Sequence, residues 1–194
     1  AVVGPMAAAA AGGGATGAAV GAVASSAATN ASVSVINNRG NLGAVFKDVT
    51  SSDAMKGYVI SGVTAGLTAG LFDGWTGTQT NPGTGAVITS PALNTWTGVG
   101  QFAANQALQN GTSTLLSKAL GQGGDFGDAL KGALFNTLAA ASFNAVGDYT
   151  KGKLTDGYPP KILVHAMVGG LLAQATGGDF KTGALAAGIN AVSY

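Results

Sequence analysis

Two sets of three glycines recur at every fourth position of the chain: Gly13, Gly17 and Gly21, and Gly62, Gly66 and Gly70. Residues four apart lie on one face of an α-helix, so each set predicts a helix face without side chains. Glycine inside a helix costs about 1 kcal/mol relative to alanine, and close packing against another backbone can offset that cost. We therefore predict that these glycines are helix-packing positions, arranged as zippers of the kind found between membrane helices.

The composition favours a folded protein with little charge. Glycine provides 33 of the 194 residues, 46% of residues are hydrophobic and only 9% are charged, whereas disordered chains are charged and poor in apolar residues. The net charge of +1 gives no electrostatic basis for a nucleic-acid partner. Cysteine is absent, which excludes disulfides and thiol chemistry.

The uncharged segments are poor candidates for constitutive membrane spans. The stretch from Ala1 to Asn38 consists mostly of Ala, Gly, Ser and Thr, which partition weakly into a membrane. As a helix, Gly57–Phe72 would be about 24 Å long, shorter than a hydrocarbon core of about 30 Å. The alternative to a constitutive membrane span is that these segments insert into a membrane only under certain conditions. Because the first charged side chain is Arg39, we expect no signal peptide and regard the chain as a piece of a longer protein.

The spacing of apolar and small residues predicts an all-α fold, with a single domain of packed Gly/Ala-rich helical hairpins over residues 1–194. The β-branched residues of Met55–Phe72 make a strand the alternative there. Helices are expected over these ranges: Ala7–Asn37 with an interruption near Gly12–Gly14, Leu42–Val49, Met55–Phe72, Gly100–Leu120 with a break near Asn110, a helix from Asp125 to about Val146, Lys161–Ala175, and a last helix to about Val192.

Residues 73–98 differ from the rest of the chain because they are rich in threonine and turn formers. Asn81-Pro82-Gly83 predicts a turn, and Ala86–Thr89 is a candidate strand. We expect a loop or β-hairpin insertion between two helical halves. Trp75 and Trp96 lie in this segment as candidate contacts to a membrane or a partner, with ordinary packing as the alternative.

A four-residue motif occurs twice, as Gly123-Gly124-Asp125-Phe126 and as Gly177-Gly178-Asp179-Phe180. Each copy precedes a segment rich in Ala and Leu, so Asp125 and Asp179 are predicted to be helix caps rather than catalytic groups. The segment after the first copy carries an apolar stripe at helical spacing: Leu130, Leu134, Leu138 and Ala141.

No group of residues predicts catalysis. His165 is the only histidine and lies in an apolar run, which is typical of a packing histidine, and a single histidine excludes a multi-histidine metal site within the chain. Glutamate is absent, and Asp48 and Asp53 are near each other in sequence. The glycine-rich stretches lack the lysine of a phosphate-binding loop. We expect a non-enzymatic chain without cofactor or metal.

Several segments together resemble a known family: Thr64-Ala65-Gly66-Leu67, Ala92-Leu93-Asn94-Thr95-Trp96, Gln106-Ala107-Leu108-Gln109-Asn110-Gly111, and Gly123-Gly124-Asp125-Phe126-Gly127-Asp128-Ala129-Leu130. They resemble the haemagglutinin-type domain of unknown function found near the C-terminus of CdiA-like and filamentous-haemagglutinin-like exoproteins. The likeness runs from about Ala27 to the end of the chain. These are packing and turn motifs, and no catalytic residue is carried over.

The resemblance implies a module of a large Gram-negative exoprotein, exported by two-partner secretion to the cell surface and placed before a toxin. We expect the module to assist toxin delivery across the target-cell envelope in contact-dependent inhibition, by helix assembly or membrane engagement. Expected partners are neighbouring delivery domains, a target membrane or envelope protein, and sister copies. The alternatives are a structural spacer or oligomerisation domain of an adhesin and, as a weaker option, a toxin enzyme such as a nuclease.

Overall fold

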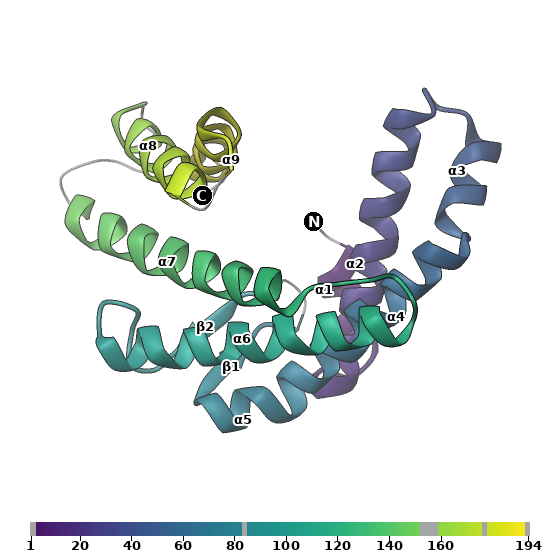
Figure 1. Ribbon diagram of the computed structural model, residues 1–194, viewed down its shortest axis with the longest axis horizontal. Coiled ribbons are helices and arrows are strands. Elements are labelled where there is room, and N and C mark those ends of the chain that lie inside the picture. Colours follow the sequence, from purple (N-terminus) through teal and green to yellow (C-terminus); the bar gives the residue numbers. More distant parts are fainter. Residues whose placement is uncertain (1–2, 83–84, 152–158, 176–177, 193–194) are drawn as a thin grey trace.

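The computed structural model describes residues 3–82, 85–151, 159–175 and 178–192. Helices make up 79% of the structure and the described strands form one small sheet, which confirms the predicted all-α class (Figure 1). The elements are α1 (Val3–Ala10), α2 (Gly14–Asn37), α3 (Leu42–Val49), α4 (Ser52–Leu67), the π-helix η1 (Thr68–Phe72), α5 (Asp73–Thr76), β1 (Thr78–Thr80), β2 (Val87–Thr89), α6 (Trp96–Ala119), α7 (Phe126–Thr150), α8 (Pro159–Ala175) and α9 (Phe180–Val192).

Helix α2 is the element around which the N-terminal half is built, since α1, α3 and α4 all lie against it (Figure 1). Its buried glycines face α1. A Cβ atom placed on Gly17 would lie 2.8 Å from the carbonyl oxygen of Ala8, and one on Gly21 would lie 3.0 Å from that of Gly4. At these two positions, the backbones of α1 and α2 are too close for any side chain between them.

Helix α4 and η1 approach a different part of the α2 surface, again through glycine. A Cβ on Gly62 would lie 2.7 Å from Val23 Cγ2, and one on Gly70 would lie 3.1 Å from Ala15 Cβ. Gly66 has more room, because its nearest neighbours, Ala15 O and Ala19 Cβ, lie at 3.4 Å. Small residues of α2 therefore contact the α4–η1 face, while the glycines of α2 contact α1.

Gly13 is not a helix-packing position, so this part of the prediction is wrong. It precedes α2 with φ of 74° and has no neighbour within 4 Å of a Cβ placed on it. Gly12 and Gly14 also have positive φ angles, of 83° and 59°. Glycine adopts this conformation without steric cost, so the three residues reverse the chain and allow α1 to fold back onto α2.

The segment at 73–98 contains the predicted hairpin. Strands β1 and β2 are antiparallel, with Gln79 opposite Ile88 at the centre of the register. The regular hairpin is shorter than the predicted insertion, because Asp73 starts α5 and Trp96 starts α6. Pro82 lies in the turn between the strands, and Gly83 lies outside the described residues.

One carboxylate attaches the hairpin to the helices. Asp73 Oδ1 accepts hydrogen bonds from the hydroxyls of Thr78 (2.7 Å) and Thr80 (2.8 Å) and from Nδ2 of Asn105 (3.0 Å). Its other oxygen accepts from the backbone N–H of Thr80 (2.7 Å). Asn105 is fully buried, so this network satisfies polar groups that would otherwise be costly to bury.

Helices α6 and α7 lie side by side (Figure 1). The predicted break near Asn110 is wrong, since α6 continues to Ala119. Asn110 instead faces α7, where its Nδ2 lies 3.5 Å from the Cβ position of Gly132. Gln106 accepts a hydrogen bond from Asn136 Nδ2 at 2.8 Å. These contacts with α7 offset the cost of about 1 kcal/mol for Gly111 inside the helix, so the helix continues past this position.

The C-terminal hairpin of α8 and α9 is held by another close approach of backbones. A Cβ on Gly169 would lie 2.7 Å from the carbonyl oxygen of Gly183, and one on Gly170 would lie 2.6 Å from the ring of Phe180. Helix α8 begins two residues before the predicted Lys161. Among the described residues, α7 is the one helix outside this hairpin that lies against it. Residues 152–158, between α7 and α8, lie outside the described part.

The close contact of α1 with α2 predicts that even one methyl group at Gly21 is harmful. Its Cβ would lie 2.8 Å from Pro82 O and 3.0 Å from Gly4 O, so Gly21→Ala should lower the free energy of unfolding by about 1–3 kcal/mol. Urea denaturation measures this. The control is Gly57→Ala in α4, where the Cβ meets nothing within 4 Å and stability should rise by about 0.4–1 kcal/mol. Equal stability of the two variants would contradict the packing argument.

Candidate functional site

Both tryptophans lie on the surface. Trp75 is 69% exposed and touches Phe72, with 5.7 Å between ring centroids, while Trp96 is 92% exposed at the start of α6. Core packing therefore does not account for either ring. Exposed tryptophans of this kind are typical of surfaces that meet an apolar phase or a partner.

The leucine stripe of α7 faces away from the protein. Leu130, Leu134 and Leu138 are 66%, 58% and 44% exposed, although their four-residue spacing is that of a packing face. The buried residues of the same helix are small or polar, namely Ala133 and Thr137. Helix α7 thus packs through a face that includes small side chains and leaves these three leucines outside.

Helix α8 repeats this arrangement. Gly169 and Gly170 are buried against α9, whereas Leu163, Met167 and Leu171 are exposed and again four residues apart. We call these two exposed series, Leu130–Leu134–Leu138 on α7 and Leu163–Met167–Leu171 on α8, the apolar ridges. The burial of one such side chain away from water stabilises by about 1.5–3 kcal/mol, so contact of the ridges with an apolar surface would be favourable.

The two predicted caps stand at helix starts. Asp125 accepts a hydrogen bond from the N–H of Asp128 (3.1 Å) at the N-terminus of α7. Asp179 accepts from the backbone N–H and the hydroxyl of Thr182, both at 2.9 Å, before α9. The backbone bond first, and the hydroxyl bond second, hold the pKa of Asp179 below its ordinary value. Capping accounts for both carboxylates by known interactions.

His165 lies between α7 and α8, half-buried. Its ring stacks on Phe143, with centroids 5.4 Å apart and the planes at 5°. This is the geometry of a packing histidine. Within the described residues, no group of three or more His, Cys, Asp or Glu side chains could hold a metal ion.

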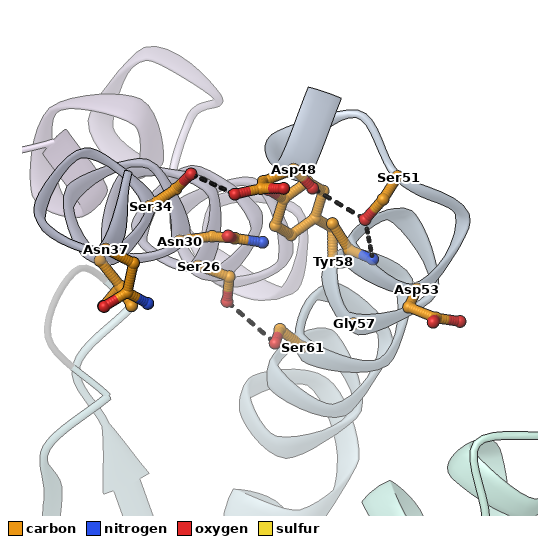
Figure 2. Close-up of a pocket in the computed structure, with 12 residues that line it drawn as sticks. Ser26, Asn30, Ser34, Asn37, Asp48, Ser51, Asp53, Gly57, Tyr58 and Ser61 are labelled. Carbon is orange, nitrogen blue, oxygen red and sulfur yellow. Dashed lines mark hydrogen bonds between the residues drawn. The ribbon is translucent and has the colours of Figure 1, made fainter. Parts of the chain in front are cut away.

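A polar groove lies between α2, α3 and α4, with a volume of about 520 Å³ (Figure 2). Ser26 donates to the hydroxyl of Ser61 (2.9 Å) between α2 and α4. Tyr58 lines the groove and donates its hydroxyl to the carbonyl of Val49 at 3.1 Å. Our reading of the sequence missed this groove. The signal is the four-residue spacing of Ser26, Asn30 and Ser34, which places three polar residues on one face of α2.

Asp48 is the charged group at the centre of one wall. Its Oδ2 accepts from the hydroxyl of Ser34 (2.5 Å) and from Nδ2 of Asn38 (2.8 Å). These two bonds, the Ser34 bond foremost, lower the pKa of Asp48 from its ordinary value. Asp48 is therefore ionised at neutral pH and joins α3 to the end of α2.

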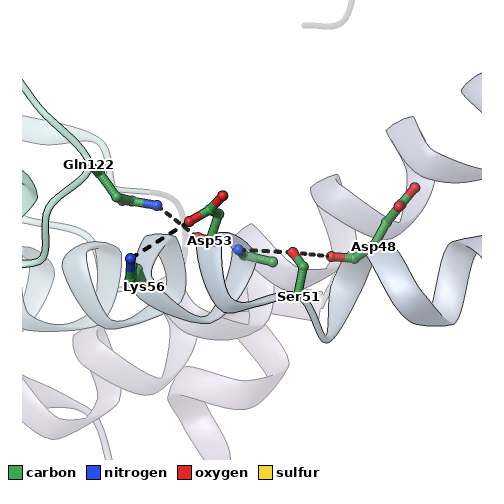
Figure 3. A network of polar contacts seen from close by, with 6 residues as sticks. Asp48, Ser51, Asp53, Lys56 and Gln122 are labelled. Carbon is green, nitrogen blue, oxygen red and sulfur yellow. Dashed lines mark hydrogen bonds and ion pairs between the residues drawn. The ribbon is translucent and has the colours of Figure 1, made fainter.

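The junction between α3 and α4 forms one side of the groove. Ser51 donates to the carbonyl of Asp48 (2.7 Å) and accepts from the N–H of Ala54 (3.2 Å), which makes it the N-cap of α4 (Figure 3). Asp53 pairs with Lys56 at 3.7 Å, and its carbonyl accepts from Gln122 Nε2 at 3.0 Å. Asp48 and Asp53 thus both line the groove, but each is engaged in a structural contact.

Helix α2 (Gly14–Asn37) is long and apolar enough to cross a membrane, with a mean hydropathy of 1.4 over 18 residues. It is the one helix among the described residues of which this is true. A single helix of this kind is weak evidence, because soluble proteins contain such helices.

The comparisons with known proteins agree with the family resemblance. The family model described as possible hemagglutinin (DUF637) matches residues 19–187. The chain belongs to this family. The match starts within α2 and ends within α9, so it includes the groove, the hairpin and both apolar ridges. Neither a curated protein nor a solved structure matches the chain. The family assignment agrees with a secreted or surface protein.

The bonds to Asp48 predict a dependence on pH. Because its pKa is lower in the folded state, the stabilisation is present above the unfolded pKa of about 3.9 and is lost as the pH falls through the folded value. Ser34→Ala should raise the pKa of Asp48 toward its ordinary value, as measured by NMR titration of the carboxyl carbon. It should also destabilise the protein more at pH 7 than below about pH 3.

Ser32→Ala is the matched control for this titration. Ser32 is exposed on the same helix and donates only to the carbonyl of Ala28 (2.8 Å), so its removal should leave the pKa of Asp48 unchanged. If the two variants gave the same titration curve for Asp48, the role of Ser34 would be wrong.

Proposed function

We propose that this chain is a non-enzymatic module of a two-partner-secreted exoprotein of a Gram-negative bacterium. Its role is to assist the delivery of a toxin across the envelope of the target cell in contact-dependent inhibition. It acts through its apolar ridges, which engage the target membrane or an apolar partner. Neighbouring domains of the exoprotein, a target-cell membrane or envelope protein and sister copies are its proposed partners.

The exposure of the apolar ridges is the observation that carries this proposal. Leucines at a regular four-residue spacing on two helices form continuous apolar strips, and such strips mark surfaces that meet a membrane or another protein. The described charges of α7 near its ridge are few: Lys131 pairs with Asp128 at 3.2 Å. A membrane can therefore receive the leucines at little cost in desolvated charge.

The weak attachment of the C-terminal hairpin supports conditional rather than permanent engagement. Helix α8 lies against α7, helix α9 lies against α8, and neither helix of the hairpin lies against any further described helix. Reorientation of this hairpin would break few contacts, and it would bring the ridge of α8 toward a membrane. A structural spacer or oligomerisation domain is the alternative, and the tight packing of α1, α2 and α4 favours it.

Vesicles of phosphatidylethanolamine and phosphatidylglycerol provide the test of membrane engagement. The wild-type chain should bind and permeabilise them, as measured by flotation and dye release. The triple variant Leu130→Gln, Leu134→Gln and Leu138→Gln should lose at least about tenfold in affinity, because each leucine loses about 1.5–3 kcal/mol of transfer energy. Absence of wild-type binding at any pH or lipid composition would refute the membrane part.

Leu42→Gln is the control, since Leu42 is also apolar and exposed but lies on α3, outside the ridges. It should bind vesicles as the wild type does. Loss of binding in both variants to the same extent would show that general hydrophobicity, and not the α7 ridge, is responsible.

The spacer alternative makes a different prediction for sedimentation. A spacer or oligomerisation domain should have the same mass with and without detergent and should ignore lipid. A membrane-engaging module should associate through its ridges in water and dissociate in detergent. Analytical ultracentrifugation of the wild-type chain and of the triple leucine variant separates the two.

A further inference from the structure

The polar groove follows from the way α2 and α4 pack. The two helices are antiparallel and closest at the glycine contacts, where Ala15 faces Gly70 and Val23 faces Gly62. Beyond the Ser26–Ser61 bond they separate, and α3 closes the far side (Figure 2). The resulting volume of about 520 Å³ is within the range of about 300–1,000 Å³ that is usual for small-ligand sites.

The chemistry of the lining favours a polar ligand that carries no negative charge. Serine hydroxyls and asparagine amides, which both donate and accept hydrogen bonds, form most of the polar wall: Ser26, Asn30, Ser34, Asn37, Ser51 and Ser61. No lysine or arginine is among the described residues that line the groove, so a phosphate or another anion has no counter-charge there. Val33, Ala54 and Tyr58 supply the apolar part of the lining.

Two polar groups in the groove have unused hydrogen-bonding capacity. Both hydrogen bonds to the carboxylate of Asp48, from Ser34 and Asn38, go to Oδ2, and no described residue donates to its Oδ1. The amide of Asn30 has no hydrogen bond to any described side chain or backbone group, and Figure 2 places it beside Tyr58 and Asp48. A carboxylate oxygen accepts strongly from a hydroxyl, and an amide serves a hydroxyl as donor or acceptor.

We propose that the groove between α2, α3 and α4 binds a neutral sugar unit of a glycan. Adjacent hydroxyls of a pyranose would donate to Asp48 Oδ1 and bond to the amide of Asn30, and the C–H face of the ring would lie toward Tyr58. A single sugar with a few such bonds in an open groove binds weakly, with a Kd of about 1 mM, which corresponds to about −4 kcal/mol.

Gly57 is a position on α4 from which a side chain would enter the groove. Gly62, Gly66 and Gly70 each have a neighbouring helix within 4 Å of the Cβ position, whereas Gly57 has none and lines the groove. A glycine inside α4 costs about 1 kcal/mol relative to alanine. A larger side chain at this position would project into the groove and fill it without a clash with the surrounding backbone.

The test measures the binding of methyl glycosides of glucose, galactose, mannose and N-acetylglucosamine to the full chain by saturation-transfer NMR and titration. At least one should bind saturably to the wild type. Gly57→Leu should fill the groove and weaken that binding by at least about tenfold, equivalent to about 1.4 kcal/mol. Gly111→Leu is the control, because Gly111 lies inside α6 with nothing within 4 Å of its Cβ position and should bind as the wild type does.

Asn30→Ala provides a second variant in case Gly57→Leu does not fold. It removes one proposed ligand contact, favours the helix, and should weaken binding several-fold while leaving the circular dichroism spectrum unchanged. The proposal is overturned if no glycoside binds the wild type, if Gly57→Leu folds and binds normally, or if only a lysine-rich peptide binds. It does not depend on membrane engagement, since vesicle binding by Gly57→Leu should equal that of the wild type.

Discussion

The close approach of backbones along α2 is the interaction on which the rest of the structure depends. Helix α1 packs against Gly17 and Gly21 of α2. The glycines of α4 and η1 pack against Ala15, Ala19 and Val23 of the same helix. Dispersion contacts weaken steeply with distance, so helices without intervening side chains gain such contacts wherever their backbones approach closely. This gain offsets the cost of glycine inside the helices and fixes the arrangement of the N-terminal half.

A core of small residues has a consequence for the surface. Alanines fill many of the helix contacts, as Ala8, Ala18, Ala133 and Ala187 do, whereas the large buried side chains Tyr58, Ile60, Phe72 and Phe102 belong to α4, η1 and α6. The large side chains of the apolar ridges on α7 and α8 are instead outside. The same packing also creates the polar groove, because α2 and α4 are in close contact only along part of their length and separate toward the N-terminus of α4.

Much of the fold could be predicted from the sequence. The glycine spacing, the caps and the turn residues indicated the helices, and Leu42–Val49 is a helix over the predicted residues. The hairpin in 73–98 is confirmed, as is the family. Gly13 and the break at Asn110 were predicted wrongly for related reasons. Position in a periodic series does not distinguish a turn glycine from a packing glycine, and a single Asn–Gly pair does not end a helix that has a neighbour to pack against.

The sequence by itself determined that this protein is helical, weakly charged and closely packed, because local spacing and composition govern helix formation and the space between helices. The tertiary structure alone decided which face of each helix is buried. The stripe Leu130–Leu134–Leu138 has the period of a core face, yet α6 packs against the small residues beside it and leaves the leucines exposed. The groove of Ser34, Asp48 and Tyr58 likewise arises from three separate helices, whose meeting depends on packing and not on any local pattern.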